Sequence, residues 1–211
     1  LPQRPVTLIS QVVVDPEDPA FSHPTKPIGP FYDKARAEAL ARETGYTFKE
    51  DAGRGWRRVV PSPDPLEIVE LPQVAAMLEA GFIPIAAGGG GIPVARDDRG
   101  RLYGVDAVID KDLAACRLAD ALKAELLLIL TEVEQVYLDY GSPQQTGLGH
   151  VSSDELLACQ GQGHFAAGSM GPKAEAALRF VSGHPFRRAV ITRLDLALPG
   201  LEGKRGTQIT D

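Results

Sequence analysis

Long apolar runs and cysteines are scarce in this sequence of 211 residues, and each scarcity excludes a class of protein. The longest apolar stretches, such as residues 126–130, have the length of a strand and fall far short of the roughly 18 residues that a membrane span needs. The two cysteines, Cys116 and Cys159, form no C-x-x-C pair, which is typical of a reduced protein of the cytoplasm. We therefore expect a cytoplasmic protein that does not enter a membrane.

Basic residues are outnumbered, with 22 Lys and Arg against 28 Asp and Glu and a formal net charge of -6. This balance argues against broad binding to nucleic acid or to a membrane surface. The rest of the composition is that of a globular protein, 44% apolar and 24% charged, and the chain is long enough to bury a core without a disulfide or a metal. At about 150 residues per domain, the length indicates one large domain or two small ones.

Apolar strand-like segments alternate with amphipathic helical segments along most of the chain. Within residues 112–123, for example, Ala115, Leu118, Ala119 and Leu122 recur with the spacing of one helix face. Strands that are apolar throughout form parallel sheets covered by helices on both faces, so the predicted fold class is α/β. The strands are predicted at 6–15, 82–87, 107–109, 125–131 and 189–192, and the helices at 33–43, 71–80, 112–123, 153–159, 172–181 and from 195.

Residues 16–64 interrupt this alternation. They begin with a proline-rich loop, continue with the helix at 33–43, for which Asp33 is the predicted N-cap, and end in a hairpin across a glycine-rich turn. Proline fixes φ and removes a backbone donor, so the loop is predicted to be irregular. We interpret residues 16–64 as an excursion from the main sheet.

Four successive glycines, Gly88, Gly89, Gly90 and Gly91, directly follow a predicted strand. Glycines allow backbone N–H groups to approach an anion closely, and ligands of open α/β sheets lie at this end of the strands. The pattern matches neither G-x-G-x-x-G nor the P-loop. It indicates an anion-binding loop, with a flexible turn as the alternative.

Two lysines stand where helices are predicted to begin. Lys111 lies between Asp110 and Asp112, either of which is a suitable helix cap, and Lys173 follows Pro172, the predicted first helical residue. A cation at a helix N-terminus opposes the helix dipole, so a structural role does not explain the lysines. Phosphoryl transfer relies on positioned positive charge and backbone donors, and both lysines point to that chemistry.

The spacing of histidines and serines indicates neither a zinc site nor a serine nucleophile. His23, His150, His164 and His184 form no H-x-x-x-H or H-E-x-x-H arrangement, which argues against a zinc site. No serine stands in a G-x-S-x-G elbow. Residues 152–155 form a capping box and need no functional interpretation.

Five segments together resemble the carbamate kinases, a branch of the amino acid kinase family, and the resemblance runs over essentially the whole chain. The segments are 25–31 (TKPIGPF), 50–63 (EDAGRGWRRVVPSP), 88–94 (GGGGIPV), 108–112 (VIDKD) and 163–173 (GHFAAGSMGPK). The resemblance implies a three-layer α/β/α sandwich with a mainly parallel sheet, from which residues 16–64 protrude as a small subdomain. It also implies reversible phosphoryl transfer between carbamoyl phosphate plus ADP and carbamate plus ATP, in arginine breakdown. The implied enzyme is a homodimer, and its Mg²⁺ is carried largely by the nucleotide.

The same resemblance implies roles for individual residues. Lys111 and Lys173 would neutralise the transferring phosphoryl group, and Asp112 would hold the two lysines in place. Lys26 would reach over the acceptor phosphate, and Gly88–Gly91 would bind carbamate or carbamoyl phosphate through backbone N–H groups. The nucleotide would be bound by Thr131, Glu132, Val133, Tyr137, Tyr140, Ser169 and Met170.

The sequence also departs from the family pattern. Carbamate kinases begin with a further βα region, about their first third, whose Gly-Gly-Asn loop contributes to the acceptor site and is not found in these 211 residues. We therefore expect Leu1 to lie within a larger α/β domain, and the 211 residues alone to bind ADP without turnover. Glu132 and Glu134 stand where Gly or Asp is commoner. The alternative within the same fold is a kinase with another acid or phosphate as acceptor.

Overall fold

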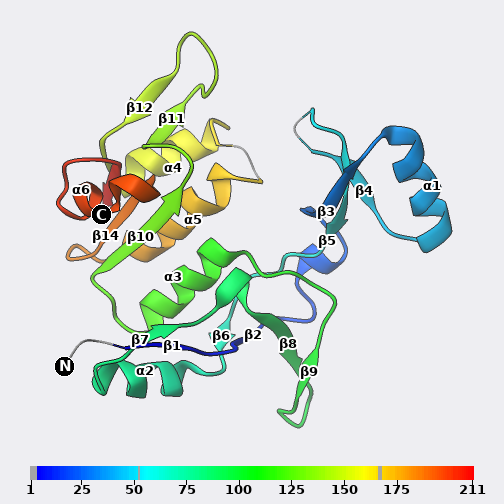
Figure 1. Cartoon of the computed structure of the whole chain (residues 1–211), viewed down its shortest axis with the longest axis horizontal. Helices are drawn as coiled ribbons and strands as arrows, with labels where there is room; N and C mark the ends of the chain where they lie inside the picture. Colours follow the sequence, from blue (N-terminus) through cyan, green and yellow to red (C-terminus); the bar gives the residue numbers. More distant parts are fainter. Residues whose placement is uncertain (1–3, 52, 166–167) are drawn as a thin grey trace. The chain divides into compact units, whose positions relative to one another are not determined.

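The computed structural model describes residues 4–51, 53–165 and 168–211. The chain divides into two compact units, unit 1 (Leu1–Ala114) and unit 2 (Ala115–Asp211), each of which is described by itself (Figure 1). Leu1 and three residues of the motifs, Ala52, Ala166 and Ala167, lie outside the described residues. No helix of the described residues is long and apolar enough to cross a membrane.

The main part of unit 1 contains two small sheets and one helix. A two-stranded parallel sheet pairs β1 with β7, and a four-stranded sheet has the order β6-β2-β8-β9, in which only β2 and β8 are parallel. Helix α2 packs against β7. The elements are β1 (Pro5–Thr7), β2 (Gln11–Val13), β6 (Glu67–Ile68), α2 (Leu71–Glu79), β7 (Ile83–Ile85), η2 (Gly88–Gly90), β8 (Ile92–Arg96) and β9 (Leu102–Gly104).

The excursion predicted at 16–64 contains an antiparallel sheet of its own. Its strand order is β3-β5-β4, and a helix packs on it (Figure 1). The helix begins as predicted, because the side chain of Asp33 accepts a hydrogen bond from the backbone N–H of Arg36, and it ends at Gly45 in the left-handed conformation. The elements are η1 (Pro19–Phe21), β3 (Lys26–Tyr32), α1 (Lys34–Thr44), β4 (Phe48–Glu50) and β5 (Trp56–Val60).

Unit 2 is built on a mixed four-stranded sheet of the order β10-β14-β15-β13. The pairs β10–β14 and β13–β15 are parallel, and β14–β15 is antiparallel. A separate hairpin, β11–β12, extends from the sheet (Figure 1). The elements are α3 (Lys111–Ala121, which begins in unit 1), β10 (Leu126–Thr131), β11 (Val136–Leu138), β12 (Thr146–Leu148), β13 (His150–Ser152), α4 (Ser153–Gly161), α5 (Met170–Val181), β14 (Arg188–Arg193), η3 (Leu194–Leu196), α6 (Ala197–Leu201) and β15 (Thr207–Thr210).

The core of unit 2 lies on both faces of β14. Residues 189–192 of this strand are completely buried in succession, which requires cover on the two faces to which their side chains alternately point. Helix α5 packs on β10, β14 and β15 and buries Phe180, and α6 packs on β10 and β14. Gly200 of α6 lies so close to β14 that a Cβ there would be 3.0 Å from a methyl carbon of Thr192. The predicted α/β class is confirmed, and the sheets are mixed because antiparallel strands join the parallel pairs.

Three predicted elements differ from those observed. The single strand at 6–15 is two strands, because the chain changes partner: β1 pairs with β7, whereas the carbonyl of Ser10 and then β2 pair with β8. Residues 107–109 form no strand, since their neighbour Pro61 accepts one hydrogen bond from Val108 but has no N–H with which to extend a ladder. Helix α5 begins at Met170 and includes Pro172 in its first turn, where the missing N–H is not needed.

Candidate functional site

A cavity of about 860 Å³ lies in unit 2, at the end of β10. All seven residues predicted to bind the nucleotide line it, although they come from three separate segments of the chain. These residues are Thr131, Glu132, Val133, Tyr137, Tyr140, Ser169 and Met170, and the cavity is also lined by Asp139, Ser142, Gln144, Gln162, Gly163 and His164.

The walls of the cavity offer aromatic and acidic groups. The rings of Tyr137 and Tyr140 lie 5.9 Å apart at an angle of 41°, and Met170 adds a polarisable thioether. Glu132 and Asp139 add carboxylates, and the described lining contains no Lys or Arg. A flat, partly apolar group with hydrogen-bond donors matches such walls, whereas a phosphate does not.

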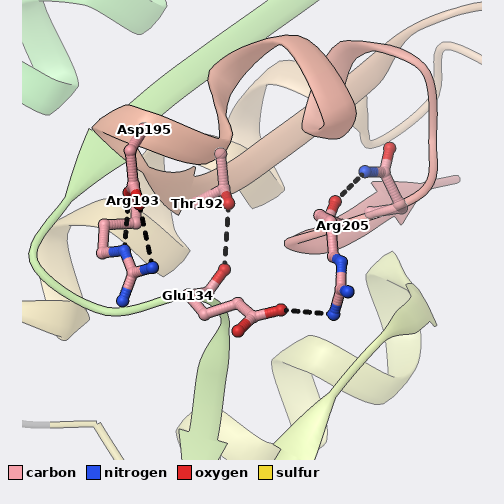
Figure 2. A network of polar contacts seen from close by, with 6 residues as sticks. Glu134, Thr192, Arg193, Asp195 and Arg205 are labelled. Atoms are coloured by element: carbon pink, nitrogen blue, oxygen red, sulfur yellow. Dashed lines mark hydrogen bonds and ion pairs between the residues drawn. The ribbon is translucent and has the colours of Figure 1, made fainter.

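The segment that follows β10 is anchored on the side of the sheet. Its residues 131–133 line the cavity, and the next residue, Glu134, is held both by its backbone and by its side chain (Figure 2). The buried hydroxyl of Thr192 donates to the carbonyl oxygen of Glu134 at 3.0 Å, and the carboxylate of Glu134 pairs with Arg205 at 3.1 Å. A buried residue of β14 and an arginine of the connection that precedes β15 thus determine where this wall of the cavity lies.

The hairpin β11–β12 is fastened at its base by one buried threonine. The hydroxyl of Thr207, on β15, accepts a hydrogen bond from the N–H of Val136 at 2.8 Å and donates to the carbonyl of Leu148. Val136 and Leu148 face each other across the hairpin. The tip of the hairpin, with Asp139 and Tyr140, is the part that reaches the cavity.

The four-glycine loop lies in unit 1 and has an unusual backbone. Gly89, Gly90 and Gly91 all have positive φ, and Ala87 before them also has φ 53°. A Cβ on Gly90 would stand 2.2 Å from the carbonyl oxygen of Ile109, so only glycine allows this approach. The close approach places the loop beside the segment that carries Asp110 and Lys111.

Asp110 organises the other predicted groups of unit 1. Its Oδ1 accepts hydrogen bonds from the N–H groups of Asp112 and Leu113 and so caps α3, which settles the alternative between the two aspartates. Its Oδ2 pairs with Nζ of Lys26, on β3, at 2.5 Å. Burial alone would raise the pKa of Asp110, but the hydrogen bond and charge of Lys26 and the two amides outweigh it and hold that pKa below its ordinary value.

The two lysines at helix starts have different surroundings. Lys111 is 59% exposed, with Nζ 3.6 Å from the carboxylate of Asp112, whereas Lys173 in the first turn of α5 is only 7% exposed. A buried lysine in that position is costly unless it has a function or a partner. The prediction that Asp112 holds both lysines joins residues of the two units and stays a prediction.

Sequence reasoning missed two contacts. The sequence predicts Asp110 as a cap or as a carboxylate beside Lys111, but not as the partner of the distant Lys26. His164 was considered only as a metal ligand, yet it lines the cavity and pairs with Asp139 at 3.2 Å. Nothing in the local sequence indicates either partner. Among the described residues, no group of three or more His, Cys, Asp or Glu is arranged to hold a metal ion.

Comparisons with known proteins place these features in context. A model of the amino acid kinase family matches residues 25–192. The carbamate kinase of Thermococcus kodakarensis is 54% identical over 208 residues, which are 98% of this chain and 65% of that protein. The carbamate kinase of Giardia lamblia bound to citric acid is 44% identical and superposes with a TM-score of 0.90, over 98% of this chain and 65% of that one.

A second structure of the Giardia lamblia carbamate kinase is bound to AMP-PNP. It is 45% identical to this chain, with a TM-score of 0.85, over 99% of this chain and 66% of that one. The chain therefore spans about two thirds of the length of the relatives that it matches, and 65% of the curated relative named above.

Proposed function

The chain belongs to the amino acid kinase family, and on that premise we propose that it carries the nucleotide-binding portion of a carbamate kinase. The reaction proposed is reversible phosphoryl transfer between carbamoyl phosphate plus ADP and carbamate plus ATP. The relatives that are named carbamate kinases support this acceptor over another acid or phosphate. We further propose a place in arginine breakdown, in the cytoplasm, as a homodimer.

One observation carries the proposal. The seven residues assigned to the nucleotide come from residues 131–133, the hairpin tip and the start of α5, and all of them line a single cavity. The cavity offers aromatic rings for a base and the carboxylate of Glu132 as an acceptor for amino or hydroxyl donors, and its described lining supplies no cation for a phosphate. We assign it to the nucleoside part of ATP or ADP and assign the phosphates to the lysines.

The lysines would stabilise the negative charge of the transferring phosphoryl group. The transferring phosphoryl group passes through a loose transition state with charge spread over its oxygens, so positioned cations and N–H donors lower the barrier and no covalent nucleophile is required. We assign Lys111 and Lys173 to the transferring group, with Asp112 orienting them. Lys26 is assigned to the acceptor phosphate, and its pairing with Asp110 supports a location beside the start of α3.

The glycine loop would bind the acceptor. The positive φ values of Gly89, Gly90 and Gly91 turn successive backbone groups in a way that suits a concave site for an anion, and Gly88 begins the turn. Magnesium would be carried largely by the nucleotide phosphates, because Mg²⁺ keeps several waters and binds substrate phosphates more often than an all-protein cage. When bound, it would neutralise the phosphate charge.

Two measurements on the 211-residue chain separate binding from catalysis. Calorimetry with ADP tests the cavity, and a coupled assay of ATP formation from carbamoyl phosphate and ADP tests the reaction. We expect ADP to bind. Absence of ADP binding would overturn the assignment of the cavity, whereas binding without turnover would make the chain a nucleotide-binding module.

The roles of the two lysines are tested in the complete protein, which includes the region that precedes these 211 residues in its relatives and is expected to catalyse the reaction. Lys111→Ala and Lys173→Ala should each lower kcat by about 10² or more, because preorganised charges of this kind contribute about that much. Lys49→Ala, on an exposed strand of the excursion, is the matched control and should leave kcat unchanged. A change in KM alone would show that the two lysines do not act on the transition state.

A further inference from the structure

Two walls of the cavity are joined by one contact between an imidazole and a carboxylate. Asp139 follows β11 at the hairpin tip, and His164 belongs to the connection between α4 and α5. Both residues line the cavity, and Nδ1 of His164 lies 3.2 Å from Oδ1 of Asp139. The pair therefore connects segments that are 25 positions apart in the sequence, at the wall of the cavity that the nucleotide is proposed to occupy.

The backbone at Asp139 is held in a sparsely populated conformation. Its φ is 49°, a left-handed value that non-glycine residues adopt at a cost and keep where their surroundings require it. The N–H of Ser142 donates to the carbonyl of Asp139, and the N–H of Gly141 donates to the side chain of Gln145. This turn directs the carboxylate of Asp139 to His164, so that the shape of the tip and the ion pair support each other.

The imidazole of His164 is fixed at both nitrogens. Nδ1 faces Asp139, and Nε2 lies 3.2 Å from Oε1 of Gln162, which also lines the cavity. A ring that is protonated at both nitrogens donates a hydrogen bond to each partner. His164 consequently has a defined orientation relative to both its own connection and the hairpin.

The hairpin needs such a contact at its tip. A two-stranded hairpin is at best marginally stable by itself in water, and the hydroxyl of Thr207 fastens only its base, at Val136 and Leu148. The tip supplies Asp139, Tyr140 and two further residues of the cavity lining. Without a contact beyond the base, this wall would have no fixed position.

We propose that the Asp139–His164 pair positions the hairpin tip as a wall of the cavity and thereby sets the affinity for the nucleotide. The two side chains are positioning residues, because they act through the tip and through Tyr140. This inference rests on the proposed function for the identity of the ligand, but the ordering of the tip does not depend on it.

The first test uses calorimetry with ADP on the 211-residue chain. Asp139→Asn and His164→Gln should each weaken binding by about three- to tenfold, and the double variant should be no weaker than the singles, because the two residues act as one contact. Asparagine tolerates the left-handed conformation, so Asp139→Asn preserves the turn. The matched controls Asp154→Asn and His150→Gln, at residues outside the cavity lining, should bind ADP as the parent chain does.

The second test follows amide hydrogen exchange without any nucleotide. Asp139→Asn should raise the exchange of residues 139–145 by about tenfold and leave β10 and β14 unchanged, because only the tip loses its contact. The proposal would be contradicted if hydrogen exchange at the tip were unchanged. It would also be contradicted if the double variant lost as much ADP affinity as the sum of the two single variants. A parent chain that fails to bind ADP would overturn the nucleotide assignment, while the exchange result would still decide whether the pair orders the tip.

Discussion

Two segments that follow parallel strands acquire their shape in different ways. The glycine loop follows β7, which among the described strands pairs with β1 alone, and Ile83 is 46% and Ile85 50% exposed. The cavity segment follows β10, whose partner β14 is buried at residues 189–192. The first segment takes its shape from positive φ values, and the second from hydrogen bonds that Thr192 and Arg205 make to Glu134.

The difference teaches where each segment is sensitive to substitution. A loop shaped by its backbone excludes a Cβ where the chain approaches closely, as at Gly90, and depends little on side chains. A segment held by side chains tolerates bulk and depends on each buried donor. Backbone donors suit an anion, and an adjustable wall of side chains suits a base. Substitutions in the two places therefore separate the two mechanisms.

The largest effect is expected for Gly90→Ala. Its Cβ would meet the carbonyl oxygen of Ile109 at 2.2 Å and would occupy a backbone with φ 113°, so the free energy of unfolding should fall by about 4 kcal/mol or more. Gly88→Ala is the matched control, since nothing lies within 4 Å of its Cβ and its φ is not positive. Urea denaturation followed by circular dichroism measures both. Equal losses in the two variants would show that close approach at Gly90 does not shape the loop.

The sheets that carry the two segments should respond almost as differently, because β14, the partner of β10, is buried and β7 is partly exposed. Ile191→Ala in β14 removes a fully buried side chain and should lower the free energy of unfolding by about 3 kcal/mol. Ile83→Ala in β7 removes a side chain that is nearly half exposed and should lower it by about 1 kcal/mol or less. The same denaturation experiment compares them, and a loss at Ile83 as large as that at Ile191 would contradict the contrast in burial.

A smaller loss is expected for Thr192→Val. The substitution keeps the shape of a buried side chain but leaves the carbonyl of Glu134 without its donor, which should lower the free energy of unfolding by about 1–3 kcal/mol. It should also weaken ADP binding, because the cavity segment loses an anchor. Thr146→Val, at an exposed hydroxyl of the hairpin, is the control and should change the stability by less than about 0.5 kcal/mol. If Thr192→Val left the free energy of unfolding unchanged, the hydrogen bond from Thr192 would not be what holds the cavity segment in place.

The smallest effect is expected for Asp110→Asn, which keeps a cap for α3 but removes the charge that faces Lys26. We expect a loss of about 1–2 kcal/mol near pH 7. Because the pKa of Asp110 is lowered in the folded chain, its contribution is complete above the unfolded pKa of about 3.9 and disappears as the pH falls through the folded value. The difference between parent and variant should therefore be constant from pH 7 to pH 5 and shrink below about pH 4. A difference that grows on acidification would contradict the sign of the shift.

Features set by neighbouring residues could be predicted from the sequence. The capping box of Ser152 and Glu155 and the N-cap Asp33 are confirmed, as is the antiparallel pairing of β4 with β5, because each depends on residues a few positions apart. The seven residues assigned to the nucleotide could be selected only through a family resemblance. Their spacing alone does not indicate a shared cavity.

What could not be predicted depends on distant partners. The predicted strand breaks at Ser10 because the carbonyl of Ser10 accepts a hydrogen bond from the N–H of Ile92. No local sequence pattern predicts that change of partner. The Lys26–Asp110 pair joins residues 84 positions apart, and the absence of a ladder at residues 107–109 depends on Pro61. Apolar patterns report burial, but they do not identify the neighbour against which a residue is buried.

The pairing of Lys26 with Asp110 has a consequence for any anion that this lysine is to contact. The anion has to displace a carboxylate that is already hydrogen bonded, so its apparent affinity is the intrinsic affinity multiplied by the fraction of molecules in which Lys26 is released from Asp110. A weakly charged anion would lose this competition, and a phosphate with two negative charges would win it. If Lys26 contacts the acceptor phosphate as proposed, its pairing with Asp110 would favour ligands of higher negative charge.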